Sequence, residues 1–134
     1  MPARYLLDTN TVSYVLKGNM PRVRQRLARK AMEDVCISVV TEAELRFGLA
    51  RRPQATKLRL IVEECLLRVE VLPWDSDAAR HYAEIRAHVE ASGRPMGNLD
   101  LMIAAQALAA GATLVTSDRS FQRIKQLKLE DWTR

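Results

Sequence analysis

The stretch LLDTNTV, Leu6 to Val12, places a carboxylate directly after a short apolar run. The apolar residues before Asp8 are typical of a buried strand, and the polar residues after it are typical of the start of a helix. A charged aspartate at the end of a buried strand is costly unless another group compensates its charge. The fold around this stretch must therefore supply that compensation.

Brief runs of β-branched residues or leucine recur along the chain. We predict strands over 4–7, 35–40, 69–72 and 112–116, with 127–129 as a candidate edge strand. We predict helices between them, over 9–17, 21–33, 41–50, 54–67, 75–91 and 99–110. Apolar strands that alternate with helices are typical of a parallel sheet covered on both faces. We therefore predict an α/β fold, with residues 1–134 forming a single domain.

The charge of the chain favours contact with polyanions such as nucleic acid. The formal net charge is +5 and the isoelectric point is near 9.6. Basic residues are concentrated in two clusters, although a solvated helical face explains each cluster equally well: Arg22, Arg24, Arg26, Arg29 and Lys30, and then Arg46, Arg51 and Arg52. Aromatic residues make up only 5% of the chain, which disfavours a protein that reads single-stranded bases by stacking.

The sequence predicts a cytoplasmic protein that does not enter a membrane. The longest nearly apolar stretch, 102–115, is interrupted by Gln106 and Gly111 and is too short to span a bilayer. Residues 1–7 lack the apolar core of a signal peptide. Cys36 and Cys65 lie in apolar surroundings, where we expect reduced, buried thiols.

Acidic residues follow the predicted strands at their carboxyl ends. Asp8 follows the first strand, and Asp118 follows the strand in LVTSD. Glu42 and Glu44 follow the second strand, in TEAELRFG. Asp100 opens the long apolar helix of GNLDLMIAAQALAAG. Because ligands of open α/β sheets bind outside the carboxyl ends of the strands, we predict that these acids gather at one edge of the sheet.

Each acid also has a purely structural interpretation. Asp8 could cap the helix that starts near Thr9, and Asp100 could lie in a first helical turn behind Asn98 as the cap. Glu44 completes a capping box that starts at Thr41. Asp118 could be a turn residue. Capping alone does not require the acids to share one location, so their convergence distinguishes the two interpretations.

Converging carboxylates need a neutralising partner. Two carboxylates ~5 Å apart repel each other by roughly 3 kcal/mol at an effective dielectric constant near 20. A site made only of oxygen ligands suits Mg²⁺ or Mn²⁺, and the sequence offers no set of soft ligands for zinc. Divalent ions held by carboxylates commonly serve phosphate chemistry. A basic protein with such a site is therefore expected to hydrolyse phosphodiesters.

Four segments resemble the PIN-domain ribonucleases, and specifically the VapC toxins of bacterial toxin–antitoxin pairs: LLDTNT, SVVTEAELRFG, GRPMGNLDLMIAAQALAAGATLVTSD and LKLEDW. The resemblance runs along the whole chain. It implies a three-layer α/β/α sandwich, Mg²⁺ or Mn²⁺ at an acidic site, and endonucleolytic cleavage of RNA, often of structured RNA such as tRNA. It also implies a homodimer, a hetero-oligomer with a cognate VapB antitoxin, and inhibition by that antitoxin.

The resemblance assigns roles to individual positions. It places the family's catalytic acids on Asp8, Glu44, Asp100 and Asp118, with Asp8, Asp100 and Asp118 as the main metal ligands. Asn10 and Thr116 match polar positions that support these acids. Many VapC toxins carry a further acid before the phenylalanine that matches Phe121, whereas this chain has Ser120 there.

Three other functions compete with this prediction. Phosphatases of the haloacid dehalogenase type also place an aspartate after the first strand, but they need a second acid two residues later, where this chain has Asn10. Receiver domains need adjacent acids near the first strand and a late lysine, which are not matched here. A catalytically inactive relative that only binds RNA or protein is the third alternative, and the retained acids argue against it.

Overall fold

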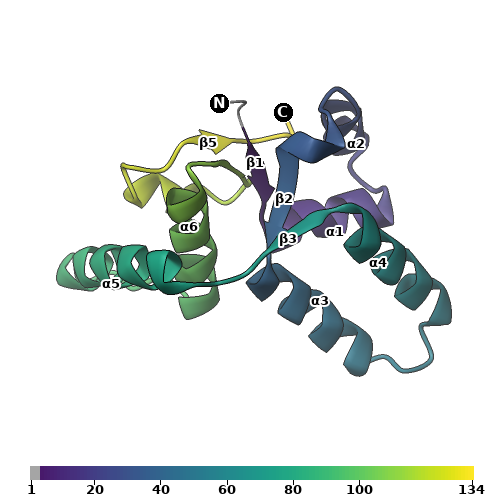
Figure 1. Cartoon of the computed structure of the whole chain (residues 1–134), viewed down its shortest axis with the longest axis horizontal. Helices are drawn as coiled ribbons and strands as arrows, with labels where there is room; N and C mark the ends of the chain where they lie inside the picture. The colour runs from purple at the N-terminus through teal and green to yellow at the C-terminus, as the bar shows by residue number, and fades with distance from the viewer. Residues whose placement is uncertain (1–3) are drawn as a thin grey trace.

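The computed structural model describes residues 4–134 and has three layers, with a parallel sheet between two layers of helices (Figure 1). The strands are β1 (Tyr5–Leu7), β2 (Val35–Ser38), β3 (Glu70–Leu72), β4 (Thr113–Val115) and β5 (Leu129–Glu130). The helices are α1 (Thr9–Lys17), α2 (Pro21–Ala28), α3 (Val39–Ala50), α4 (Thr56–Arg68), α5 (Ser76–Ala91) and α6 (Asn98–Ala110), with short 3₁₀ helices η1 (Met32–Asp34) and η2 (Arg119–Arg123). The predicted α/β fold is confirmed.

The strands lie in the order β3-β2-β1-β4-β5, and every neighbouring pair is parallel. The chain first extends the sheet from β1 to β2 and β3, and then returns to the other side of β1 to add β4 and β5. The strand order therefore reverses between β1 and β4. Ligand sites of open α/β sheets lie at the carboxyl ends of the strands beside such a reversal.

Alternating side chains of the central strands build two cores. Leu6 of β1 and Leu114 of β4 face one side, where they pack with α5 and α6. Leu7 and Val115, the next residue on each strand, face the other side, where they pack with α1, α2 and α4. Successive side chains of a strand point to opposite faces, so strands that are apolar throughout must be covered on both sides.

The carboxyl-terminal tail is anchored by Trp132, which is 1% exposed. The centroid of its ring lies 5.7 Å from the ring centroid of Tyr5. Its indole N–H donates a hydrogen bond to Oε1 of Glu130 over 2.9 Å. Burial of this large side chain fixes the tail beyond β5 against the α1 and α2 side of the sheet.

Most predicted elements match to within two residues, but the helix predicted over 21–33 was wrong, because α2 ends at Ala28 and a separate 3₁₀ helix, η1, covers Met32–Asp34. The starts of two other helices were also misplaced. The second strand ends at Ser38 rather than at residue 40, and α3 begins at Val39 with Ser38 as its N-cap, where the Ser38 hydroxyl accepts from the Val40 amide over 3.0 Å. The capping box predicted from Thr41 to Glu44 therefore does not exist. Helix α6 begins at Asn98 behind Gly97, so Asn98 is the first helical residue rather than the cap.

No helix within residues 4–134 is both long enough and apolar enough to cross a membrane. Cys36 and Cys65 are free cysteines. Burial raises the pKa of the Cys36 thiol to about 11, which keeps this group protonated at neutral pH.

Candidate active site

Asp8 lies where β1 meets α1, at the carboxyl end of the central strand, and is 5% exposed. Its Oδ1 accepts a hydrogen bond from the Thr11 amide over 2.8 Å, so Asp8 is the N-cap of α1. Its own amide donates to the carbonyl oxygen of Val115 over 3.1 Å, which ties the end of β1 to the end of β4. Capping of α1 therefore uses only one of the two carboxylate oxygens of Asp8.

Thr116 connects Asp8 to Asp118. The buried Thr116 hydroxyl forms a hydrogen bond with the Asp8 carboxylate, and it accepts one from the Asp118 amide over 3.0 Å. One side chain therefore supports both acids at the reversal of the strand order. The sequence resemblance placed a supporting residue at this position.

Burial raises the pKa of Asp8, while the hydrogen bonds from Thr116 and Thr11 oppose this effect by stabilising the charged form. The negative charge of Asp118 adds a smaller upward contribution. Among the residues that the structure describes, only neutral hydrogen-bond donors, those of Thr116 and Thr11, lower the pKa of Asp8, and no cation contributes.

Asp100 lies in the first turn of α6 and is half-buried. Its pKa is raised, first by burial and then by the negative charges of Asp118, Glu44 and Asp8. All four predicted acids are therefore close enough to act on one another, although they are far apart in the sequence. Topology brings them to the same end of the sheet.

Glu44 reaches this group from the second turn of α3. Its Oε1 accepts from the Thr9 hydroxyl over 2.5 Å, and the Thr9 hydroxyl in turn lies 3.2 Å from that of Thr41. Glu42 differs, since its carboxylate pairs with Arg46 over 2.7 Å on the outside of the helix. Sequence reasoning did not identify Thr9, which connects α1 to the Glu44 carboxylate.

Asn10, which the resemblance assigned to the support of Asp8, is exposed and lies elsewhere. It lines a hollow of about 240 Å³ between α1, α3 and α4, together with Thr9 and Glu44. Thr11 and Thr116 take the supporting role that was predicted for Asn10. Thr11 could have been found from the sequence, because the amide three residues after an N-cap aspartate is a usual partner of its carboxylate.

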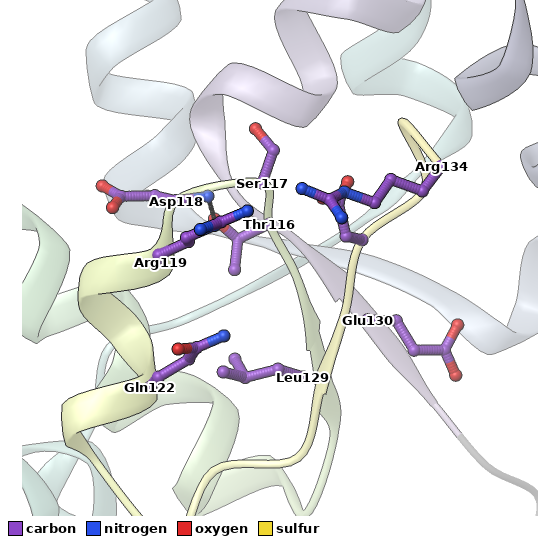
Figure 2. Close-up of a pocket in the computed structure, with 9 residues that line it drawn as sticks. Thr116, Ser117, Asp118, Arg119, Gln122, Leu129, Glu130 and Arg134 are labelled. Atoms are coloured by element: carbon purple, nitrogen blue, oxygen red, sulfur yellow. Dashed lines mark hydrogen bonds and ion pairs between the residues drawn. The ribbon is translucent and has the colours of Figure 1, made fainter.

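The side chains are not arranged as ligands of one ion. Within the described part of the chain, no three His, Cys, Asp or Glu side chains are placed to hold a metal together. Asp118 caps η2, where its Oδ1 accepts from the Ser120 amide over 2.9 Å, and its carboxylate points away from the hollow beside it (Figure 2). The donor set nevertheless fits a hard cation, because it consists of carboxylates that repel one another.

Comparison with known proteins agrees with this geometry. The family model described as PIN domain matches residues 5–127. The chain is 35% identical over 131 residues to the tRNA(fMet)-specific endonuclease VapC of Shigella flexneri, which covers 97% of this chain and 98% of that protein. It is 32% identical over 130 residues to ribonuclease VapC2 of Haemophilus influenzae, covering 96% of this chain and 98% of the relative.

Solved structures show the same likeness. The DNA-bound VapBC of Salmonella typhimurium aligns with a TM-score of 0.90 and 35% identity, over 98% of this chain and 99% of the other. The chain belongs to the PIN-domain family, and within that family to the VapC ribonucleases. It is therefore a nuclease, and the phosphatase and receiver-domain alternatives lose their support.

Proposed function

We propose that this chain is a divalent-metal-dependent endoribonuclease, the toxin of a toxin–antitoxin pair, and that Asp8, Asp100, Asp118 and Glu44 form its active site. The observation that carries the proposal is the electrostatic coupling of the four acids, since Asp100 experiences the charges of the other three. Uncompensated repulsion of this kind has no structural benefit, whereas it provides a binding site for a cation.

We assign the metal, Mg²⁺ or Mn²⁺, mainly to Asp8, Asp100 and Asp118. Each of the capping aspartates keeps one carboxylate oxygen that its helix does not use, and Asp100 has no capping bond. When bound, such an ion would polarise a phosphoryl oxygen and lower the pKa of water. Binding requires the Asp118 side chain to turn toward the other acids.

The remaining polar residues position these acids. Thr116 and Thr11 favour the ionised form of Asp8 and so oppose the rise in its pKa that burial causes. The hydrogen bond from Thr9 occupies Oε1 of Glu44 and leaves Oε2 available to orient the attacking water or accept its proton. The water attacks the phosphorus in line and gives its proton to Glu44, the bond between phosphorus and the 3′ oxygen breaks, and the 3′ oxygen takes up a proton from solvent.

We propose structured RNA, such as tRNA, as the substrate. The printed name of the Shigella flexneri relative specifies tRNA(fMet), and the positive net charge of this chain favours a polyanion. Sequencing of RNA ends after brief induction without antitoxin would identify the target. Cleavage spread evenly over unstructured messenger RNA would contradict this assignment.

We also propose a VapB-type antitoxin as the inhibitory partner. The hollow beside Glu44 is lined in part by Arg51 and Arg52, and it shares Leu16 with a largely apolar hollow of about 190 Å³ between α1, α2 and α4. An antitoxin segment with an apolar portion and an acidic portion would fill both hollows and block access to the acids. Co-expression with the neighbouring small gene product should give a stable complex and relieve toxicity.

Exposed apolar side chains support assembly into a homodimer and a hetero-oligomer. Phe47 on α3 is 61% exposed, and Leu60 and Leu67 on α4 are 72% and 82% exposed. We infer that these side chains belong to one interaction surface, because large contiguous apolar patches on a protein surface mark sites of protein association. Light scattering of the isolated chain and of its antitoxin complex would give the two stoichiometries.

The central experiment is RNA cleavage with and without metal. Activity should disappear in excess chelator and return with Mg²⁺ or Mn²⁺, and the same ions should raise the melting temperature, because they bind only the folded site. Asp8→Asn and Asp100→Asn should suppress cleavage and reduce the metal-induced stabilisation. Wild-type cleavage by both variants would show that the active site lies elsewhere.

A further inference from the structure

The arginines of this chain fall into two groups according to their partners. Arg46, Arg68, Arg80 and Arg86 lie on α3, α4 and α5, and each pairs with an acid three or four positions away on its own helix. Within residues 4–134, by contrast, Arg22, Arg29 and Arg119 have no ion-pair partner. Other arginines in this part of the chain also lack an ion pair, among them Arg51, Arg52 and Arg59. Arg22, Arg29 and Arg119 differ from these because they line two neighbouring hollows, where their charge is available to a ligand.

A hollow of about 320 Å³ adjoins the acidic site where β4 ends. Figure 2 shows Arg119 and Arg134 on opposite sides of this hollow, with their guanidinium groups turned toward each other and toward Ser117. Glu130, which also lines the hollow, points its carboxylate away from the two arginines (Figure 2). Arg134 also pairs with Asp131 over 3.6 Å in this hollow, an ion pair that a phosphate would replace. Two facing guanidinium groups beside a hydroxyl form a suitable clamp for one phosphate group.

A second hollow, of about 300 Å³, continues from the first, because Arg134 lines both. Its other lining residues are Arg22, Gln25, Arg26 and Arg29 of α2. Arg26 serves the fold here, since its guanidinium donates to the carbonyl oxygens of Asp131 and Arg134, each over 3.1 Å. Arg22 and Arg29 are exposed and do not serve the fold in this way.

The lining of the two hollows favours nucleic acid over a protein ligand. Protein interfaces are usually centred on apolar or aromatic anchors in a pocket. Leu129 is the only apolar side chain among the residues that line these two hollows. The remaining lining is polar or charged. It holds five arginines and three acids, Asp118, Glu130 and Asp131, and the guanidinium groups match a phosphate backbone.

We propose that Arg119, Arg134, Arg22 and Arg29 form an arginine track that binds the RNA backbone on one side of the cleavage site. The inference rests on the proposed ribonuclease activity and adds the path of the substrate to it. The RNA leaves the acids past Ser117, passes between Arg119 and Arg134, and continues along α2. Trp132 holds the tail in place, so that Arg134 connects the two hollows.

The test compares two double variants that lose the same charge. Arg22→Gln with Arg29→Gln removes the distant half of the track. Arg80→Gln with Arg86→Gln is the control, because both arginines lie on α5, line neither hollow, and each pairs with an acid on its own helix. Cleavage is measured on two substrates. One is a long single-stranded RNA that contains the target site, and the other is a trinucleotide that reaches the four acids but is too short to reach Arg22 and Arg29.

For the long RNA, the track variant should raise KM about tenfold and leave kcat unchanged. The slope of log affinity against log salt should become shallower by about 1.4, because each phosphate contact to a single strand contributes roughly 0.7. On the trinucleotide, the track variant should behave as the wild type does. The control should match the wild type on both substrates.

Equal KM values for the track variant and the control on the long RNA would overturn the proposal. An equal rise in KM on the trinucleotide would also overturn it. Normal RNA binding by the track variant together with lost capture of the antitoxin would overturn it as well, and would assign the track to a protein partner. Failure of the wild type to cleave either RNA would instead count against the proposed function. Fluorescence anisotropy with the same long RNA would then still test the track, by its affinity and salt slope.

Discussion

Replacing Thr116 by valine tests whether the fold is built to keep a buried carboxylate charged. The substitution preserves shape and removes only the hydroxyl, which serves Asp8 and the Asp118 amide. A hydrogen bond to a charged group contributes about 1.5–3 kcal/mol, and one between neutral groups contributes about 0.5–1.5 kcal/mol. The variant should therefore lose about 2–4 kcal/mol of unfolding free energy at neutral pH.

The pH dependence of this loss identifies its cause. The Thr116 hydroxyl lowers the pKa of Asp8 by favouring its ionised form, so its removal raises a pKa that burial has already raised. As the pH falls through the folded-state pKa of Asp8 toward its ordinary value of 3.8, the carboxyl becomes neutral and the hydroxyl contributes less. The cost of Thr116→Val should consequently shrink by about 1 kcal/mol in acid.

Urea unfolding of the metal-free protein from pH 7 to about pH 4 measures this change. At neutral pH, the melting temperature of the variant should also be roughly 6–12 °C lower, because each kcal/mol of lost stability lowers it by ~3 °C in a domain of this size. Thr116→Ser is the matched control, since it keeps the hydroxyl and should cost about 1 kcal/mol for the lost methyl group at every pH. A valine variant whose cost does not change with pH would refute the role of Thr116 as a support of ionised Asp8.

Three further substitutions give separate predictions. Asp8→Asn keeps the cap of α1 and removes a buried carboxylate whose pKa is raised. In urea titrations of the metal-free protein it should therefore raise the free energy of unfolding at neutral pH, and this gain should vanish as the pH falls toward 3.8. Glu44→Gln should reduce RNA cleavage about a hundredfold while Glu42→Gln leaves it unchanged; the reverse order in kcat would exchange their roles. Gln106→Leu leaves the buried O–H of Ser38 without its acceptor and should cost about 1–3 kcal/mol in calorimetry, a loss that an unchanged melting temperature would contradict.

Local patterns in the sequence predicted most of the secondary structure. The helix over 9–17 has its predicted limits, because a capping aspartate, Asp8, directly precedes it and a glycine, Gly18, directly follows it. The start of α3 was missed for a reason that local patterns do not reveal. Ser38 ends a buried strand and caps the helix at once, so the chain turns without the linker that a cap at Thr41 would need.

The gathering of the acids was predictable from general topology, and their exact support was not. Acids that follow parallel strands meet at one edge of the sheet, which the residue order alone indicates. Whether Asn10 or Thr11 faces Asp8 depends on the helical positions after the cap, and only the structure shows that Asn10 turns toward α3 and α4. The same holds for Thr9, whose hydroxyl meets Glu44 across 35 residues of sequence.

The sequence by itself determined the alternation of apolar strands and helices, the acid after each central strand, and the excess of arginine, because these follow from residue types at short range. Tertiary structure alone decided that β4 pairs with β1, which brings Asp118 beside Asp8. It also decided that the tail beyond β5 packs next to α2, which joins Arg134 to Arg22 and Arg29. Such contacts depend on which strands pair and which large side chains are buried together, and these are properties of the whole folded chain.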